Sequence, residues 1–236
     1  MKKTDKLMTY TIVTLATAFI INMLIYSGSK PLTANWHHFN MTLPLDEAVP
    51  FIPVSLAIYV VSFGFWLLFY LIAALGRSGE RGVDLSVEGE IGGYERDRFF
   101  AADVLSKFVC FAFFLIVPTT MTRPEIQGTG LWDQAVVLAY MIDTPDGLFP
   151  SIHCLVSWFC WIGVRSREDL PPALKWFAFV FAVLICISTV TVKQHVIVDV
   201  LGGVILAELC YWLTGFDKVR GLYIRPMKKL MGIFIK

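Results

Sequence analysis

The chain has 236 residues, of which 56% are hydrophobic and 14% aromatic, and its mean hydropathy is +0.66. A soluble domain is usually about 45–50% apolar, so this composition argues against a soluble protein. The formal net charge is only +1, which gives no reason to expect nucleic acid as a partner. All five cysteines fall in apolar segments and none forms a CxxC pair, which argues against a zinc knuckle or a disulfide framework.

Two long segments in the first third of the chain contain no charged residue. Residues 7–29 and 48–76 lack Asp, Glu, Lys and Arg altogether. Since about 20 apolar residues cross the hydrocarbon core as a helix, each segment predicts a transmembrane span. The first follows a basic N-terminus and could imitate a signal peptide, but it is too long and has no A-x-A-like cleavage site. We therefore expect an uncleaved first span.

Four further apolar segments complete the expected bundle. They lie at about residues 99–122, 148–165, 175–192 and 196–214. Within the third, Asp103 and Lys107 are spaced to pair on one helix face. Only Lys193-Gln194-His195 separates the last two, which predicts a tight helical hairpin, and Glu208 in the sixth span should face the bundle interior. The sequence thus predicts an all-α polytopic membrane bundle of six helices in a single domain, residues 1–236, with a catalytic core at about 99–215.

The basic residues predict the orientation. Sixteen of the 20 Lys and Arg residues fall in segments that share a side with the N-terminus, whereas the opposite segments hold only Lys30, Arg123 and Lys193. The positive-inside rule then places both termini in the cytoplasm. The Gly-rich, charged residues 76–98 are expected to form a cytoplasmic loop. In the outer stretch 124–149, the mostly apolar run that starts at Leu131-Trp132 and includes Val136 to Ile142 favours a helix lying in the membrane interface.

Ionisable side chains gather at the outer ends of the predicted spans. Arg123 ends the third span, and His153 begins the fourth within Phe149-Pro150-Ser151-Ile152-His153. Lys193 and His195 lie in the hairpin, and Asp199 follows one helical turn deeper. Such groups are costly inside a membrane and usually face a polar cavity. Their convergence at one depth predicts a functional site on the extracytoplasmic side.

The spacing of these residues indicates phosphoryl chemistry. His195 and Asp199 are four residues apart, which is about 6 Å along a helix axis. A carboxylate there can accept the ring N–H, fix the tautomer and raise the basicity of the other nitrogen. His195 is then a candidate nucleophile toward phosphorus, and His153 can protonate the leaving alkoxide. Arg123 and Lys193 would bind the non-bridging oxygens.

The same residues allow simpler interpretations. A single histidine at a membrane interface is usually a satisfied polar residue, and Arg123 and Lys193 taken singly could be interfacial anchors. A metal site is a further alternative, with His37 and His38 as additional ligands, although no cluster of soft ligands accompanies them.

Three short motifs resemble those of a known family. Pro150-Ser151-Ile152-His153 and the pattern Ser188-x6-His195-x3-Asp199 resemble the second and third motifs of the type-2 phosphatidic acid phosphatase superfamily, and Arg123-Pro124 resembles the end of its first motif. The resemblance covers about residues 45–215. It implies metal-independent phosphotransfer through a phosphohistidine, with no cofactor. His195 would be the nucleophile, Asp199 its orienting partner and His153 the general acid, while Ser151, Arg123 and Lys193 would belong to the phosphate pocket.

The chain departs from the common pattern at three positions. Ile116 stands where the first motif usually has Lys, Thr189 where the third has Arg, and Ile152 where the second has Gly. Lys193 would replace one of the two missing cations. With Asp46-Glu47 and Pro50-Phe51-Ile52-Pro53 opening the second span, this variant looks closer to the inositol phosphorylceramide synthase-like branch, whose members transfer a phospho-headgroup to an alcohol.

Three functional hypotheses follow from these residues. The first is a lipid phosphate phosphatase that acts at the extracytoplasmic face of the cell membrane. The second is a lipid phosphotransferase with the same covalent step and an alcohol acceptor. The third is a non-catalytic lipid-binding or transport protein, against which the intact set of His195, Asp199 and His153 argues. Each has a membrane lipid phosphate and the bilayer as partners; the sequence leaves the lipid, the acceptor and the oligomeric state open.

Overall fold

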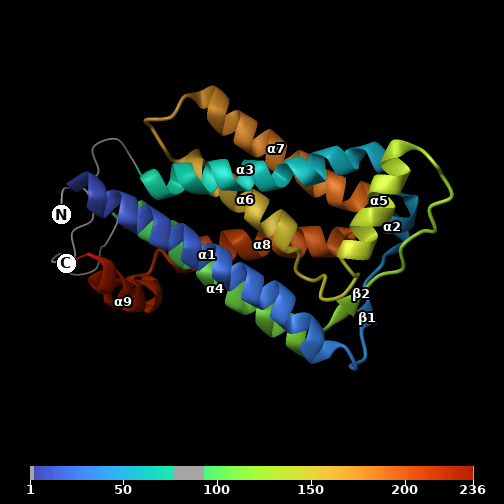
Figure 1. Ribbon diagram of the computed structural model, residues 1–236, viewed down its shortest axis with the longest axis horizontal. Coiled ribbons are helices and arrows are strands. Elements are labelled where there is room, and N and C mark those ends of the chain that lie inside the picture. The colour runs from blue at the N-terminus through green and yellow to red at the C-terminus, as the bar shows by residue number, and fades with distance from the viewer. Residues whose placement is uncertain (1–2, 77–92, 236) are drawn as a thin grey trace.

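A computed structural model describes residues 3–76 and 93–235 of the chain (Figure 1). Most of the expected cytoplasmic loop falls in residues 77–92 and lies outside the described residues. The described elements are α1 (Lys3–Thr33), β1 (Phe39–Asn40), α2 (Pro44–Ala48), the 3-10 turn η1 (Pro53–Ser55), α3 (Leu56–Leu75), α4 (Tyr94–Ile116), β2 (Thr119–Thr120), α5 (Leu131–Ile142), α6 (Ile152–Arg165), α7 (Pro172–Thr191), α8 (Ile197–Leu213) and α9 (Asp217–Phe234).

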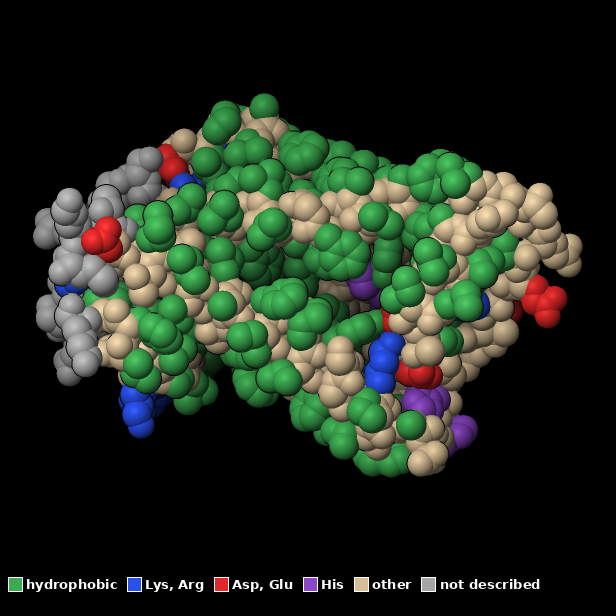
Figure 2. Space-filling model, in the orientation of Figure 1, with side chains coloured by type: hydrophobic (Ala, Val, Ile, Leu, Met, Phe, Trp, Pro, Cys, Tyr) green, Lys and Arg blue, Asp and Glu red, His purple; other side chains and the backbone are tan. Residues whose placement is uncertain are grey.

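The architecture is an all-helical membrane bundle. Helices α1, α3, α4 and α7 are long and apolar enough to cross a membrane, and α8 with α9 makes a fifth candidate that bends by 89°. The α6 helix has only 14 residues, about 21 Å, whereas the hydrocarbon core is about 30 Å thick. The described residues therefore support four or five spans, and the expected number of six is not confirmed. Figure 2 shows hydrophobic side chains along this face and charged ones gathered at its two ends.

The α4 helix begins earlier than the apolar pattern suggested. It starts at Tyr94 rather than near residue 99, and it buries Arg96 and Asp97 in its first turn. These charges obscured the start of the helix because hydropathy alone scores them as loop. Deeper in the same helix, Lys107 Nζ and Asp103 Oδ1 are 2.8 Å apart with both side chains 1% exposed, which confirms the predicted pair.

The core forms around α6, which packs against α3, α7 and α8, while α4 joins α1, α8 and α9 (Figure 1). The backbones of α6 and α8 approach closely at Gly203. A Cβ added there would lie 2.5 Å from the carbonyl oxygen of Ser151, so only glycine allows this contact. The close approach brings the first turns of α6 and α8, and hence the predicted catalytic residues, to the same end of the bundle.

Loops and short elements cover that end of the bundle. Strands β1 and β2 form a two-residue parallel pair, Phe39 with Thr119 and Asn40 with Thr120. Helix α2 and the predicted interfacial helix, found as α5, lie beside the hairpin that joins α7 to α8 (Figure 1). At the opposite end lie the start of α1 and all of α9. The sequence had indicated only a basic segment there, but α9 buries Tyr223, Ile224, Met227 and Met231 against the bundle.

Candidate active site

The turn between α7 and α8 has a defined backbone conformation. The carbonyl oxygen of Thr189 accepts hydrogen bonds from the backbone N–H groups of Gln194 (2.9 Å) and His195 (3.1 Å). Lys193 takes the left-handed conformation, with φ of 54°, which reverses the chain. The hydroxyl of Tyr140 on α5, which is not part of the turn, donates to the carbonyl of Val192 at 2.7 Å. The predicted tight hairpin is therefore confirmed, and its backbone presents His195 in a fixed position.

His195 and Asp199 are in contact, although not through a shared helix face. His195 precedes the first residue of α8, so the two side chains meet across the N-terminal turn rather than along the helix. The Nδ1 atom of His195 lies 3.3 Å from Asp199 Oδ2, which also accepts the backbone N–H of Val196 at 3.1 Å. The Asp199 carboxylate thus caps α8 and orients the imidazole of His195 at the same time. With Nδ1 engaged, Nε2 is the nitrogen left to react.

Two opposing effects set the proton affinity of His195. Burial lowers its pKa, because a charged imidazolium loses hydration. The hydrogen bond to Asp199 and the negative charge of that residue act in the other direction and prevail, so the pKa is raised above 6.5. An imidazole of raised basicity is a stronger nucleophile once it is deprotonated.

His153 lies behind His195 in an aromatic enclosure. Its ring stacks on Tyr59 at a centroid distance of 4.5 Å and contacts Trp66 at 5.2 Å. The two imidazole centroids are 6.0 Å apart, close enough for one phosphoryl group to touch both rings. Among the described residues, His153 Nε2 is buried without a hydrogen-bond partner, so it can still bind one.

Arg123 joins three segments at the end of the bundle that holds His195. Its Nη1 donates to the carbonyl oxygen of Asp143 at 2.5 Å, and its Nη2 donates to the side-chain oxygen of Gln194. The guanidinium also stacks over Tyr140, 4.4 Å from the ring centroid. Burial lowers the pKa of Arg123, and the nearby Asp143 carboxylate counteracts this shift. Its Nε is buried and has no partner in the described part of the chain.

Lys193 and Asp46 connect the hairpin to α2. Lys193 Nζ donates to the backbone carbonyls of Asp46 (2.8 Å) and Val49 (2.7 Å). The buried Asp46 carboxylate accepts the backbone N–H groups of Ile197 and Leu43, both at 2.7 Å. Two of the three ammonium protons of Lys193 are therefore engaged, and the third is free for a ligand oxygen.

Ser151 acts as a helix cap in the structure. Its hydroxyl accepts the backbone N–H of Cys154 at 3.3 Å, and its own N–H donates to the carbonyl of Asp199 at 3.0 Å. The residue is fully buried, so its predicted contact with phosphate stays a prediction. Of the positions that depart from the family pattern, Ile116 is 76% exposed at the end of α4, whereas Thr189 is buried beneath the hairpin.

An open cavity of about 430 Å³ lies in front of His195. Three of the predicted site residues line it, namely His195, Arg123 and Lys193, whereas His153, Asp199 and Ser151 lie behind this layer. The remaining lining residues are Thr42, Asp46, Glu47, Val49, Pro50, Phe51, Met121, Thr122, Pro124, Val190 and Val196. The structure therefore brings the predicted residues together around one cavity at one end of the bundle.

Sequence reasoning missed two residues of this region. Asp143 binds Lys30 at 2.8 Å through its carboxylate and Arg123 through its carbonyl, and Tyr26 also donates to it. In the sequence, Asp46 is distinguished only as part of the variant family pattern. Both are acidic residues in loops between the predicted spans, where acidic side chains carry little topological information. Only the three-dimensional arrangement shows that Asp143 binds Arg123 and that Asp46 binds Lys193 and a backbone N–H of α8.

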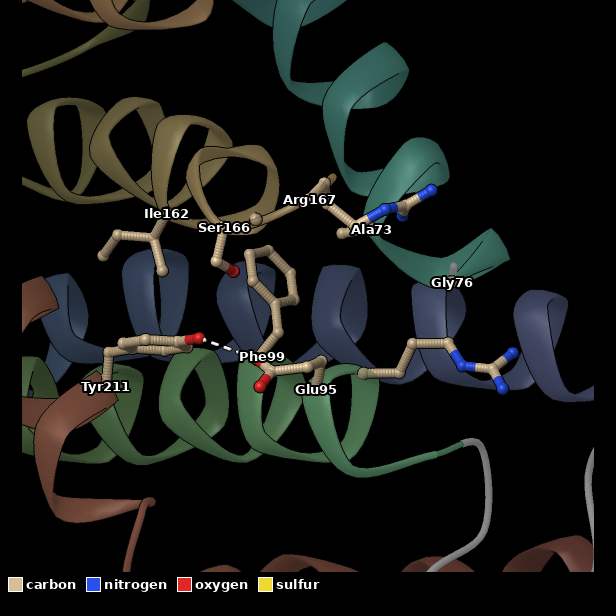
Figure 3. A pocket seen from close by; sticks show the side chains of 10 residues that line it. Ala73, Gly76, Glu95, Phe99, Ile162, Ser166, Arg167 and Tyr211 are labelled. Atoms are coloured by element: carbon tan, nitrogen blue, oxygen red, sulfur yellow. Dashed lines mark hydrogen bonds between the residues drawn. The ribbon is translucent and has the colours of Figure 1, made fainter. Parts of the chain in front are cut away.

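Elsewhere in the described part of the chain, polar groups do not form a comparable site. At the opposite end, a pocket lies between α3, α4, α6 and α8, where the Tyr211 hydroxyl donates to Glu95 at 3.0 Å (Figure 3). Its volume of about 20 Å³ holds roughly one water. Glu208 pairs with Arg165 and accepts from Trp158, but its side chain is 37% exposed rather than interior. Over residues 3–76 and 93–235, no three His, Cys, Asp or Glu side chains gather to hold a metal ion.

Comparison with known proteins agrees with this geometry. No curated protein shows a significant match to the chain. A family model, described as PAP2 superfamily, matches residues 55–216, from the start of α3 to the end of the α8 segment. That range contains His153, His195, Asp199 and Arg123 and more than two thirds of the chain, and it leaves the inositol phosphorylceramide synthase-like branch unconfirmed. Such membership supports a phosphatase- or phosphotransferase-type function on lipid phosphates, and the chain belongs to the PAP2 superfamily.

Proposed function

We propose that the protein is a lipid phosphate phosphatase that works through a phosphohistidine on His195. The observation that carries this proposal is the arrangement of two imidazoles with centroids 6.0 Å apart, one of them held by a buried carboxylate, beside an open cavity. A nucleophile, its orienting group and a separate proton donor are the elements that such a reaction needs.

The reaction has two displacements. His195 Nε2 attacks phosphorus, the bond between phosphorus and the lipid oxygen breaks, and His153 gives its proton to the leaving alkoxide. Water then attacks the phosphohistidine, His153 takes a proton from that water, and inorganic phosphate leaves as the nitrogen–phosphorus bond breaks. The negative charge of the bound phosphate favours the protonated form of His153 in the first step.

Positive charge for the phosphoryl oxygens comes from Arg123 and Lys193, which line the cavity. The unpartnered Nε of Arg123 and the third proton of Lys193 are the donors we assign to it. No metal ion is required in this scheme, because these cations and the two imidazoles supply the charge and the proton transfers.

The membrane arrangement belongs to the same proposal. Six membrane-embedded helices, with α6 as a short one, would place both termini in the cytoplasm and the cavity on the extracytoplasmic side of the cell membrane. The distribution of Lys and Arg supports this orientation.

A second candidate, transfer of the phosphoryl-linked group to a lipid alcohol, is favoured by one specific feature. An apolar groove of about 380 Å³ runs between α7 and α8, and it shares Val49 and Val190 with the cavity in front of His195. An alcohol attached to a second lipid could reach the phosphohistidine from this groove.

The proposal is tested with purified protein and a panel of lipid phosphates carrying ³²P, with free phosphate and new lipid species both measured. Turnover with an acid-labile label on His195 is expected, and His195→Ala should abolish both. His37→Ala is the matched control, because His37 is an exposed outer histidine away from the cavity. Label or turnover that persists in His195→Ala would exclude the mechanism. Release of a new phospholipid instead of phosphate would identify the second candidate.

A further inference from the structure

A second cavity lies between α1 and α3, below His153. Its volume is about 330 Å³, and Figure 2 shows the hollow on this face of the bundle. Its walls are largely apolar and aromatic, formed chiefly by Leu15, Ala18, Phe19, Phe63, Trp66 and Leu67. None of these residues is part of the proposed catalytic step.

This cavity opens toward the region that lipid tails occupy. Phe19 and Leu67 at its rim are 64% and 69% exposed, and both lie near the middle of helices that qualify as membrane spans. Residues at that position in a span face hydrocarbon rather than water. An entrance there admits an apolar chain from the side of the bundle.

Two wall residues of the cavity are in contact with His153. Trp66 and Phe63 line the cavity, and their rings also contact His153 at centroid distances of 5.2 and 6.1 Å. His153 is the group that would protonate the leaving oxygen, so the lipid attached to that oxygen has to start beside these rings. From Phe63 to Tyr70 the α3 wall continues inward for about 10 Å.

The inner end of the cavity is closed by polar groups that satisfy one another. Asp103 accepts from the Tyr70 hydroxyl at 2.6 Å and from Lys107 at 2.8 Å. This neutral pair offers no net charge to a phosphate, which therefore binds at His195 instead. Asn22 adds an amide to the wall, and its Oδ1 has no partner in the described residues, so a hydroxyl or amide N–H on the lipid would satisfy it.

We propose that this cavity holds the hydrocarbon chain of the leaving group, so that the substrate is a lipid phosphate that enters between α1 and α3. This inference rests on the proposed function and adds where the lipid chain lies and from which side of the bundle it enters. Since lipid tails are as apolar as the cavity walls, binding there contributes orientation of the phosphate rather than affinity. Correct orientation at a reacting centre is worth about 10²-fold in rate.

The test blocks the cavity and compares two substrates in detergent micelles or vesicles of phosphatidylcholine. Ala18 is buried at the cavity wall, whereas Ala16 faces outward on the same helix. Ala18→Trp should lower kcat/KM for a long-chain lipid phosphate by about 10²-fold relative to that for a short, soluble phosphate monoester. Ala16→Trp should leave that ratio unchanged. An equal ratio in both variants would overturn the inference.

A measurement on the unmodified protein covers the case in which Ala18→Trp does not fold. A lipid phosphate with a diazirine in the middle of its chain should crosslink to peptides of α1 and α3. Crosslinks confined to α7 and α8 would place the chain in the other groove and overturn the inference while the proposed function stands. If the wild-type protein turns over neither the long nor the short phosphate, the proposed function itself fails.

Discussion

At the scale of single residues, Asp199 controls both the position and the basicity of His195. Its Oδ2 meets His195 Nδ1 at 3.3 Å and the Val196 N–H at 3.1 Å, so one oxygen orients the ring and caps the helix. The sequence could predict this pair from its four-residue spacing. The geometry differs from that expectation, since hydrophobic periodicity does not reveal that α8 starts only after His195.

The acid limb of the pH profile should report this contact. The nucleophile must be unprotonated, so activity falls as the pH drops through the raised pKa of His195, above 6.5. Asp199→Asn removes the two largest effects that raise this pKa and leaves the burial that lowers it. The acid limb of kcat/KM should therefore move to lower pH, while the plateau rate falls by about 10²–10⁴-fold. A pH-rate profile of both proteins decides this, and an unmoved limb would contradict the assignment of His195.

At the scale of elements, α2 fixes the position of the hairpin and of the first turn of α8. The Asp46 carboxylate binds the Ile197 N–H, two residues after His195, and the Asp46 carbonyl binds Lys193 Nζ. This contact spans about 150 residues of sequence, which is why no local pattern predicted it. The hairpin itself was predictable from its length, but the segments that hold it in place were not.

The contact between α2 and the start of α8 can be tested with neighbouring residues of α2. Asp46→Ala leaves two partly buried N–H groups without an acceptor, which should cost about 1–2 kcal/mol of stability. It should also lower kcat by roughly tenfold, because the hairpin loses its fixed position. Leu45→Ala, the matched control on the same helix, should change neither, because Leu45 is exposed and does not line the cavity. Thermal unfolding in detergent and steady-state rates are the measurements; equal effects of both variants would contradict a specific role for Asp46.

At the scale of the whole molecule, the candidate site residues lie at one end of the bundle and most of the basic residues at the other. Composition and apolar runs were sufficient to predict a helical membrane protein, because burial in lipid requires long uncharged helices. The predicted number of six spans is not confirmed, since residues 148–165 contain both a loop and the short α6. The apolar runs also missed α9, whose alternation of basic and apolar residues averages to a low hydropathy.

A labelling experiment can test the orientation of the chain in the membrane. Gln127 lies in the stretch 124–149 that we predict to be extracytoplasmic, and Glu168 lies between α6 and α7; both are exposed. Gln127→Cys should react with an impermeant thiol reagent on intact cells, and Glu168→Cys only after lysis. The five native cysteines are buried, so the unmodified protein gives the background. The reverse pattern would place the cavity in the cytoplasm.

The shortness of α6 has a consequence for how deep the reaction takes place. Fourteen residues rise about 21 Å, which leaves about 9 Å of a 30 Å hydrocarbon core unfilled. If Arg165 lies at the inner boundary, His153 in the first turn sits about 12 Å beneath the outer one. A phosphate would then be drawn below the level of its neighbouring headgroups while its tail stays in the leaflet. Bilayer thickness thereby becomes a physical determinant of how readily a lipid reaches the two histidines.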